Sequence, residues 1–119
     1  MPAHEKLNYV EYPASDLAAT KAFFETAFGW SFEDYGPDYI AFSNQGLDGG
    51  FFRSPKRSAI ADGGALLVFY SDRLEDTLQK VVAAGGQIVK PIFTFPGGRR
   101  FHFQEPSGNE FAVWGMPGV

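Results

Sequence analysis

The chain has 119 residues, a formal net charge of −4 at pH 7 and no cysteine. This length is typical of one domain with its own core. The lack of cysteine excludes disulfides and thiolate chemistry, and the acidic balance predicts no nucleic-acid surface. No apolar run approaches the roughly 20 residues that cross a membrane, and the start lacks the apolar region of a signal peptide. We therefore expect a cytoplasmic protein that binds neither nucleic acid nor membrane.

Two features of the composition are unusual. Short basic clusters, Arg53/Lys56/Arg57 and Arg99/Arg100, lie beside proline or glycine. We interpret them as solubilising loop residues, with a clamp for phosphate or carboxylate as the alternative. The chain also has 13 Phe, 5 Tyr and 2 Trp. The favoured interpretation is a sheet core filled with large rings, and the alternative is that some rings line a ligand groove.

The first half of the chain reads as a strand, a helix and three further strands. Residues 7–14 form the first expected strand. Asp16 is a suitable helix N-cap, and Gly29 is a suitable left-handed stop at the other end. The next strands, separated by turn residues, are expected at Trp30–Asp34, Tyr39–Ser43 and Gly50–Arg53.

The second half repeats this order. A buried strand is expected at residues 66–70, and Asp72 and Gly85 have the same separation as Asp16 and Gly29. Asp72 and Glu75 also fit a capping box at the start of the second helix. The later strands are expected at Gln87–Lys90, Arg100–Gln104 and Glu110–Trp114.

Both expected helices are amphipathic. Their apolar stripes are Leu17, Phe24, Ala27 and Phe28 in the first helix, and Leu74, Leu78, Val81 and Val82 in the second. Each half therefore reads β-α-β-β-β. The sequence predicts an α+β fold in which residues 1–119 form one domain of two tandem modules, at about 5–56 and about 64–116.

Several motifs carry a resemblance to a known family. They are P-A-S-D-L at 13–17, A-F-G-W at 27–30, A-A-G-G at 83–86 and E-P-S-G-N-E-F-A-V-W at 105–114. In these motifs the chain resembles the vicinal oxygen chelate superfamily, which includes glyoxalase I, extradiol dioxygenases and bleomycin-resistance proteins. The resemblance implies two modules whose sheets curl around a common cleft, usually in a homodimer.

The resemblance also implies four positions that hold a divalent metal in the metal-using members. They correspond to Tyr9, Leu66, Ala112 and a residue near Phe51 or Phe52. None of these side chains is an imidazole or a carboxylate, the donors that such a metal needs. The two histidines, His4 and His102, fall elsewhere. We therefore expect no metal and no cofactor.

Alternation along the strands indicates which side chains face the cleft if Tyr9 and Ala112 do. The same alternation makes Arg100 a candidate for the cleft as well. A shift of one residue in the strand register would turn every one of these side chains to the other face of its sheet. The cleft residues predicted in this way are Tyr9, Glu11, Leu66, Tyr70, His102, Glu110, Ala112 and Trp114.

Three of these residues, Glu11, His102 and Glu110, are candidates for catalysis. A carboxylate in an apolar cleft could exchange a proton with a carbonyl compound, with His102 as its partner. Each candidate also has a structural interpretation. Glu11 could pair with a neighbouring cation, His102 could be a hydrogen-bonded core imidazole, and Glu110 could be solvated. Trp114 could fill the core or a dimer interface.

Three functions remain open from the sequence. The first is metal-independent lyase or isomerase chemistry on a small organic molecule held in an aromatic cleft. The second is a binding protein that sequesters a drug or metabolite, aromatic or cationic, in the manner of the bleomycin-resistance proteins. The third is a non-catalytic interaction subunit.

Overall fold

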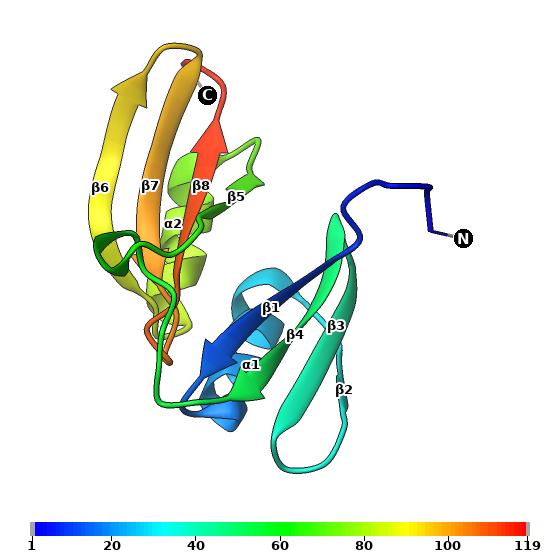
Figure 1. The fold of residues 1–119 in the computed structure, drawn as a ribbon. Coiled ribbons are helices and arrows are strands. Elements are labelled where there is room, and N and C mark those ends of the chain that lie inside the picture. Colours follow the sequence, from blue (N-terminus) through cyan, green and yellow to red (C-terminus); the bar gives the residue numbers. More distant parts are fainter. Residues whose placement is uncertain (1, 119) are drawn as a thin grey trace.

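The computed structural model describes residues 2–118. Two four-stranded mixed sheets each carry one helix, which confirms the predicted α+β class (Figure 1). The first module consists of β1 (Tyr9–Ala14), α1 (Leu17–Phe28), β2 (Phe32–Asp34), β3 (Tyr39–Gln45) and β4 (Leu47–Arg53), and its four strands form the first sheet. The second module consists of β5 (Leu67–Tyr70), α2 (Leu74–Ala83), β6 (Gln87–Phe95), β7 (Gly98–Gln104) and β8 (Glu110–Gly115), and its four strands form the second sheet. The linker between them contains the short helix η1 (Ile60–Asp62).

The two sheets have the same topology. Their strand orders are β1-β4-β3-β2 and β5-β8-β7-β6. In each sheet the first strand of the module runs parallel to the last, and the other pairs are antiparallel. The strands β1 and β5 are therefore both sheet edges.

The two helices begin differently. The Asp16 carboxylate accepts a hydrogen bond from the Ala19 N–H at 3.0 Å, and Gly29 ends α1 with φ of 69°, as predicted. The capping box predicted for α2 is wrong. Arg73 is the N-cap residue and makes no side-chain cap bond. Asp72 instead accepts from the Tyr70 hydroxyl, and Glu75 is bound by Arg99.

The strand β6 is longer than predicted. The expected strand ends at Lys90, yet β6 continues through Pro91 to Phe95. A proline is tolerated here because β6 is an edge strand and its pairing with β7 is irregular between Lys90 and Phe93. Val82, predicted on the apolar stripe of α2, is 48% exposed.

Aromatic rings fill the core between the modules, as the favoured interpretation of the composition predicted. The Phe24 ring lies 5.6 Å from Phe51 of the first sheet and 5.4 Å from Phe111 of the second. Phe23 lies 5.7 Å from Phe103. The helix α1 thus contacts the helix-facing side of both sheets, and this packing fixes how the two modules sit.

The opposite side of each sheet, here called its outer face, is not covered by a helix. In Figure 1 both helices lie behind the sheets, so the two outer faces turn to the same side of the molecule. The linker with η1 crosses in front of the second sheet. Within residues 2–118, no helix combines the length and the apolar character needed to span a membrane.

Candidate functional site

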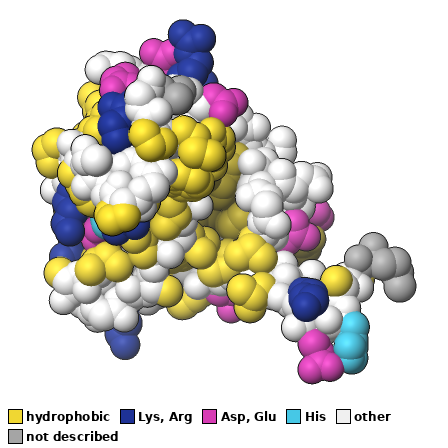
Figure 2. All heavy atoms as spheres, turned by 90° about the horizontal axis from the view of Figure 1, so that it is seen from above, with side chains coloured by type: hydrophobic (Ala, Val, Ile, Leu, Met, Phe, Trp, Pro, Cys, Tyr) yellow, Lys and Arg dark blue, Asp and Glu magenta, His cyan; other side chains and the backbone are white. Residues whose placement is uncertain are grey.

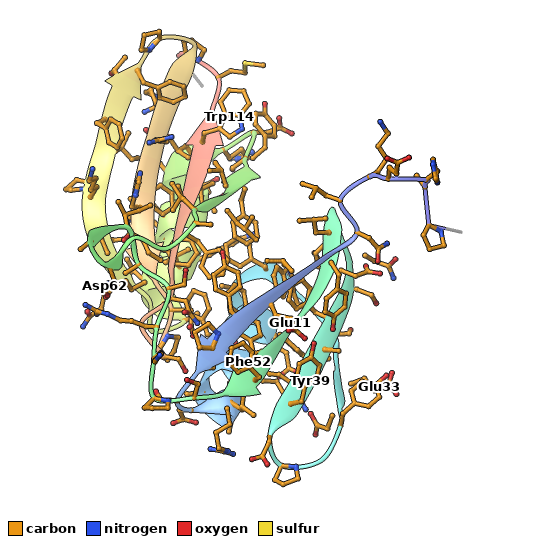
Figure 3. The ribbon with its side chains drawn as sticks, viewed as in Figure 1. Glu11, Glu33, Tyr39, Phe52, Asp62 and Trp114 are labelled. Atoms are coloured by element: carbon orange, nitrogen blue, oxygen red, sulfur yellow. The ribbon has the colours of Figure 1, made fainter. Side chains whose placement is uncertain are left out.

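The outer face of the first sheet carries a chain of hydrogen bonds between three strand residues. The Tyr39 hydroxyl on β3 donates to a Glu11 carboxylate oxygen on β1 at 3.0 Å, and it is also hydrogen-bonded to the Tyr9 hydroxyl. Figure 3 shows Glu11 and Tyr39 together on this face. The intervening strand β4 has Gly50 here, where a Cβ would lie 2.1 Å from the Tyr39 hydroxyl. The glycine therefore leaves room for the Tyr39 phenol to lie across β4.

The direction of these hydrogen bonds decides what Tyr9 offers to a ligand. Burial raises the pKa of Tyr39, and the hydrogen bonds to Tyr9 and Glu11 raise it further. Tyr39 therefore keeps its proton, and its O–H donates a hydrogen bond to the Glu11 carboxylate. The Tyr9 O–H then donates a hydrogen bond to the Tyr39 oxygen. The Tyr9 oxygen is therefore left to accept a hydrogen bond from a ligand. Beside this chain lies an open pocket of about 600 Å³, lined by Tyr9, Tyr35, Tyr39 and Asp48 among others.

The outer face of the second sheet contains a buried pair of side chains, His102 and Glu110. The His102 Nδ1 atom lies 2.8 Å from a Glu110 carboxylate oxygen, and the two residues are 2% and 4% exposed. The linker covers them, because the Ile60 N–H donates to the other Glu110 oxygen at 3.1 Å. The Glu110 N–H in turn donates to the Ser58 carbonyl at 2.8 Å. Both oxygens of this carboxylate are therefore engaged by the protein.

The remaining predicted cleft residues lie on or near the same sheet. Ala112 is fully buried opposite His102 on β7, and Leu66 is half-buried just before β5. Tyr70 is 48% exposed, and its ring meets Trp114 edge-on at 5.0 Å. Figure 3 shows Trp114 near the C-terminal end of β8, away from Glu11.

The structure thus divides the predicted cleft residues between two faces. It brings His102 and Glu110 together, and it brings Tyr9 and Glu11 together, but Glu11 and His102 belong to different sheets. Tyr39 was missed by sequence reasoning. Its alternation with Ala41 could place it on a face, but nothing local indicates that its hydroxyl reaches two strands away.

The residues at the family's metal positions do not fit a divalent ion. Phe51 is buried in the core and Phe52 is on the outer face, 39% exposed. Ala112 lies opposite Val68, and Tyr9 supplies one phenol oxygen. Among residues 2–118 there is no group of three or more His, Cys, Asp or Glu side chains that could hold a metal.

A second concave region lies between the modules. Its volume is about 440 Å³, and rings of both modules line it, including Trp30, Phe42, Phe69 and Phe111. Figure 2, which views the molecule from above, shows hydrophobic side chains gathered in the middle of this surface. Part of the aromatic excess therefore lines a groove as well as the core.

Comparison with known proteins gives one family. The family model described as glyoxalase/bleomycin resistance protein/dioxygenase superfamily matches residues 6–113. No curated protein gives a match. The match covers nearly the whole chain, including both helices and the E-P-S-G-N-E motif.

Solved structures agree with this match at the level of the fold. A glyoxalase-related enzyme from Fulvimarina pelagi has a TM-score of 0.78 and 19% identity, and the match covers 93% of this chain and 88% of that one. A family member from Burkholderia phytofirmans PsJN has a TM-score of 0.76 and 18% identity, covering 93% and 98%. A lactoylglutathione lyase from Agrobacterium tumefaciens has a TM-score of 0.71 and 20% identity, covering 95% of each chain.

Proposed function

Because the chain belongs to the glyoxalase/bleomycin resistance protein/dioxygenase superfamily, we propose that it binds a small organic molecule against the outer faces of its sheets. The supporting observation is where four of its large exposed side chains lie. Tyr9, Phe52, Val68 and Tyr70 are 39–48% exposed, and all four are on outer faces. Apolar side chains gathered on one side of a small domain are typical of a binding surface.

A second copy of the chain would complete this site. Outside the part that the linker covers, the outer faces are open in one chain, and β1 and β5 are edge strands with backbone groups that a second strand could pair. The homodimer implied by the family resemblance would bring the first sheet of one copy beside the second sheet of the other. A ligand would then lie between two aromatic faces and be shielded from water.

The geometry favours binding over catalysis. The linker covers the polar atoms of His102 and Glu110, so a substrate has no direct access to that pair. Glu11 is accessible, but its hydrogen-bond partner is Tyr39 and it lies on the other sheet from His102. A base and a polarising donor therefore do not converge on one bound molecule. The drug-binding members of the family are the better analogy than the lactoylglutathione lyase.

The test compares two valines of nearly equal exposure. Val68 on the outer face of β5 is 45% exposed, and Val82 on α2 is 48% exposed. The probe is N-phenyl-1-naphthylamine, a neutral aromatic compound whose fluorescence rises in apolar surroundings. We expect Val68→Glu to weaken its binding about tenfold or more, because a buried charge must be desolvated. Val82→Glu should leave binding unchanged.

Sedimentation velocity on the same variants tests the assembly. A wild-type dimer that Val68→Glu dissociates and Val82→Glu preserves would support a site shared between copies. If wild-type protein does not bind the probe, or if both glutamates weaken binding equally, the outer faces are not the binding surface. The interaction-subunit interpretation would then gain support.

A further inference from the structure

Three basic side chains surround one aromatic ring on the outer face of the second sheet. The Arg100 guanidinium carbon lies 5.4 Å from the centre of the Phe93 ring, and the Lys90 Nζ atom lies 6.0 Å from it. The His102 ring is 5.9 Å away. Strand register explains the cluster, because Lys90 pairs with His102 and Phe93 pairs with Arg100 between β6 and β7.

Arg100 differs from every other arginine of the chain. Arg53, Arg57, Arg73 and Arg99 each bind a carboxylate, at 3.0, 3.2, 2.7 and 2.6 Å respectively. Within residues 2–118 Arg100 has no such ion pair, although the chain contains 14 acidic residues and only 10 Lys and Arg. Its guanidinium lies over two rings, Phe93 and, at 5.6 Å, Phe95. Those contacts hold its position, and no carboxylate of residues 2–118 pairs with its N–H groups.

Two buried nitrogens in this cluster also lack a partner. The Arg100 Nε and the His102 Nε2 are shielded from solvent, and neither has a hydrogen-bond acceptor or donor in residues 2–118. His102 is 2% exposed, so its free nitrogen cannot turn to bulk water. Buried polar groups that stay unpaired are costly. A bound anion could accept from the Arg100 guanidinium, whereas the linker over His102 and Glu110 keeps a ligand away from the His102 nitrogen.

The aromatic surroundings indicate what accompanies the anionic group. The Phe95 ring lies 6.4 Å from Trp114, and Trp114 meets Tyr70 at 5.0 Å. These rings continue from the basic cluster across the outer face toward β5. A ligand whose charged group met Arg100 could therefore lay an apolar body on Phe95 and Trp114.

We propose that the outer face of the second sheet recognises an organic anion, with a carboxylate or phosphate group bound by Arg100 and Lys90 and an apolar body against Phe95 and Trp114. This inference rests on the proposed binding function and names the class of its ligand. Guanidinium binds such anions through paired N–H groups, and Lys90 adds a point charge. An organic cation would instead meet two positive charges on this face.

Two related probes separate the anionic group from the apolar body. 8-Anilinonaphthalene-1-sulfonate carries the ring system of N-phenyl-1-naphthylamine plus one sulfonate, so the pair differs by the charged group alone. The variants are Arg100→Gln, Arg100→Lys and, as the control, Arg99→Gln. Arg99 is on the same strand and its removal changes the net charge equally, but its guanidinium binds Glu75 of α2.

We expect the sulfonate probe to bind wild-type protein more tightly than the neutral probe does. Arg100→Gln should weaken the sulfonate probe about tenfold or more and leave the neutral probe within about twofold. Arg100→Lys should recover part of that loss because it keeps the charge without the planar fork. Arg99→Gln should change neither probe, and circular dichroism should show that each variant is folded.

Other outcomes overturn the inference in distinguishable ways. If the neutral probe binds but Arg100→Gln does not weaken the sulfonate probe, anion recognition is wrong and the proposed binding function stands. If Arg100→Gln instead dissociates a dimer and leaves the sulfonate probe unchanged, the guanidinium binds a carboxylate of the second copy. If neither probe binds wild-type protein, both proposals fail.

Discussion

Asn109 joins three separate parts of the chain, so its side chain offers a sharp test of what holds the modules together. It is fully buried. Its amide nitrogen donates to the Pro13 carbonyl of β1 at 2.6 Å and to the Glu105 carboxylate at 2.7 Å. Its amide oxygen accepts from the Ser58 N–H of the linker at 2.8 Å. One side chain thus connects the first sheet, the linker and the end of β7.

Replacing this side chain removes all three hydrogen bonds at once. A neutral hydrogen bond contributes about 1 kcal/mol, and one to a charged group about 1.5–3 kcal/mol. Asn109→Ala also leaves the buried carbonyl and N–H without their partner, so we expect a loss of about 3–5 kcal/mol in the free energy of unfolding. Domains of this kind have stabilities of about 5–15 kcal/mol, and the variant should therefore be close to unfolding.

Urea unfolding followed by circular dichroism measures this loss. The matched control is Asn8→Ala, since Asn8 is an exposed asparagine just before β1. It should change the free energy of unfolding by less than about 0.5 kcal/mol. A loss below about 1.5 kcal/mol for Asn109→Ala would show that the aromatic core alone fixes the modules and that the polar joint contributes little.

Two further predictions concern other parts of the molecule. Gly50→Ala should destabilise the protein by about 1–3 kcal/mol, because its Cβ would lie 2.1 Å from the Tyr39 hydroxyl. The same change in a Tyr39→Ala background should cost much less in urea unfolding, and an equal cost would refute the steric argument. Burial raises the pKa of the Glu105 carboxyl above 4.5, although hydrogen bonds from Thr20 and neighbours partly oppose this. The folded protein therefore binds this proton more tightly than the unfolded chain, so stability should fall as the pH rises from about 4.5 to the raised pKa. Glu105→Gln should remove that part of the slope in unfolding measurements between about pH 4 and pH 8, and an unchanged slope would contradict it.

The family resemblance and the strand alternation predicted much of the second sheet. Phe101, Phe103 and Phe111 alternate with the predicted cleft residues His102, Glu110 and Ala112, and all three are buried in the core. Arg100 was an inward candidate on the same reasoning, and Arg99/Arg100 had been interpreted as a solubilising pair or an anion clamp. The structure separates these two arginines, since consecutive residues of a strand point to opposite faces.

The sequence by itself determined the features that depend on near neighbours. The Asp16 cap, the Gly29 stop and the two-residue period of β7 and β8 each follow from the local backbone. The repeated order of elements then restricted the fold to two similar modules.

Only the tertiary structure decided which polar groups meet. The linker lies over His102 and Glu110, the Tyr39 phenol crosses Gly50 to reach Glu11, and among residues 2–118 Arg100 has no carboxylate partner. Each of these depends on groups far apart in the sequence and on distances of a few ångströms. Periodicity assigns a side chain to a face but not to a partner, because the partner is set by how the sheets, helices and linker pack together.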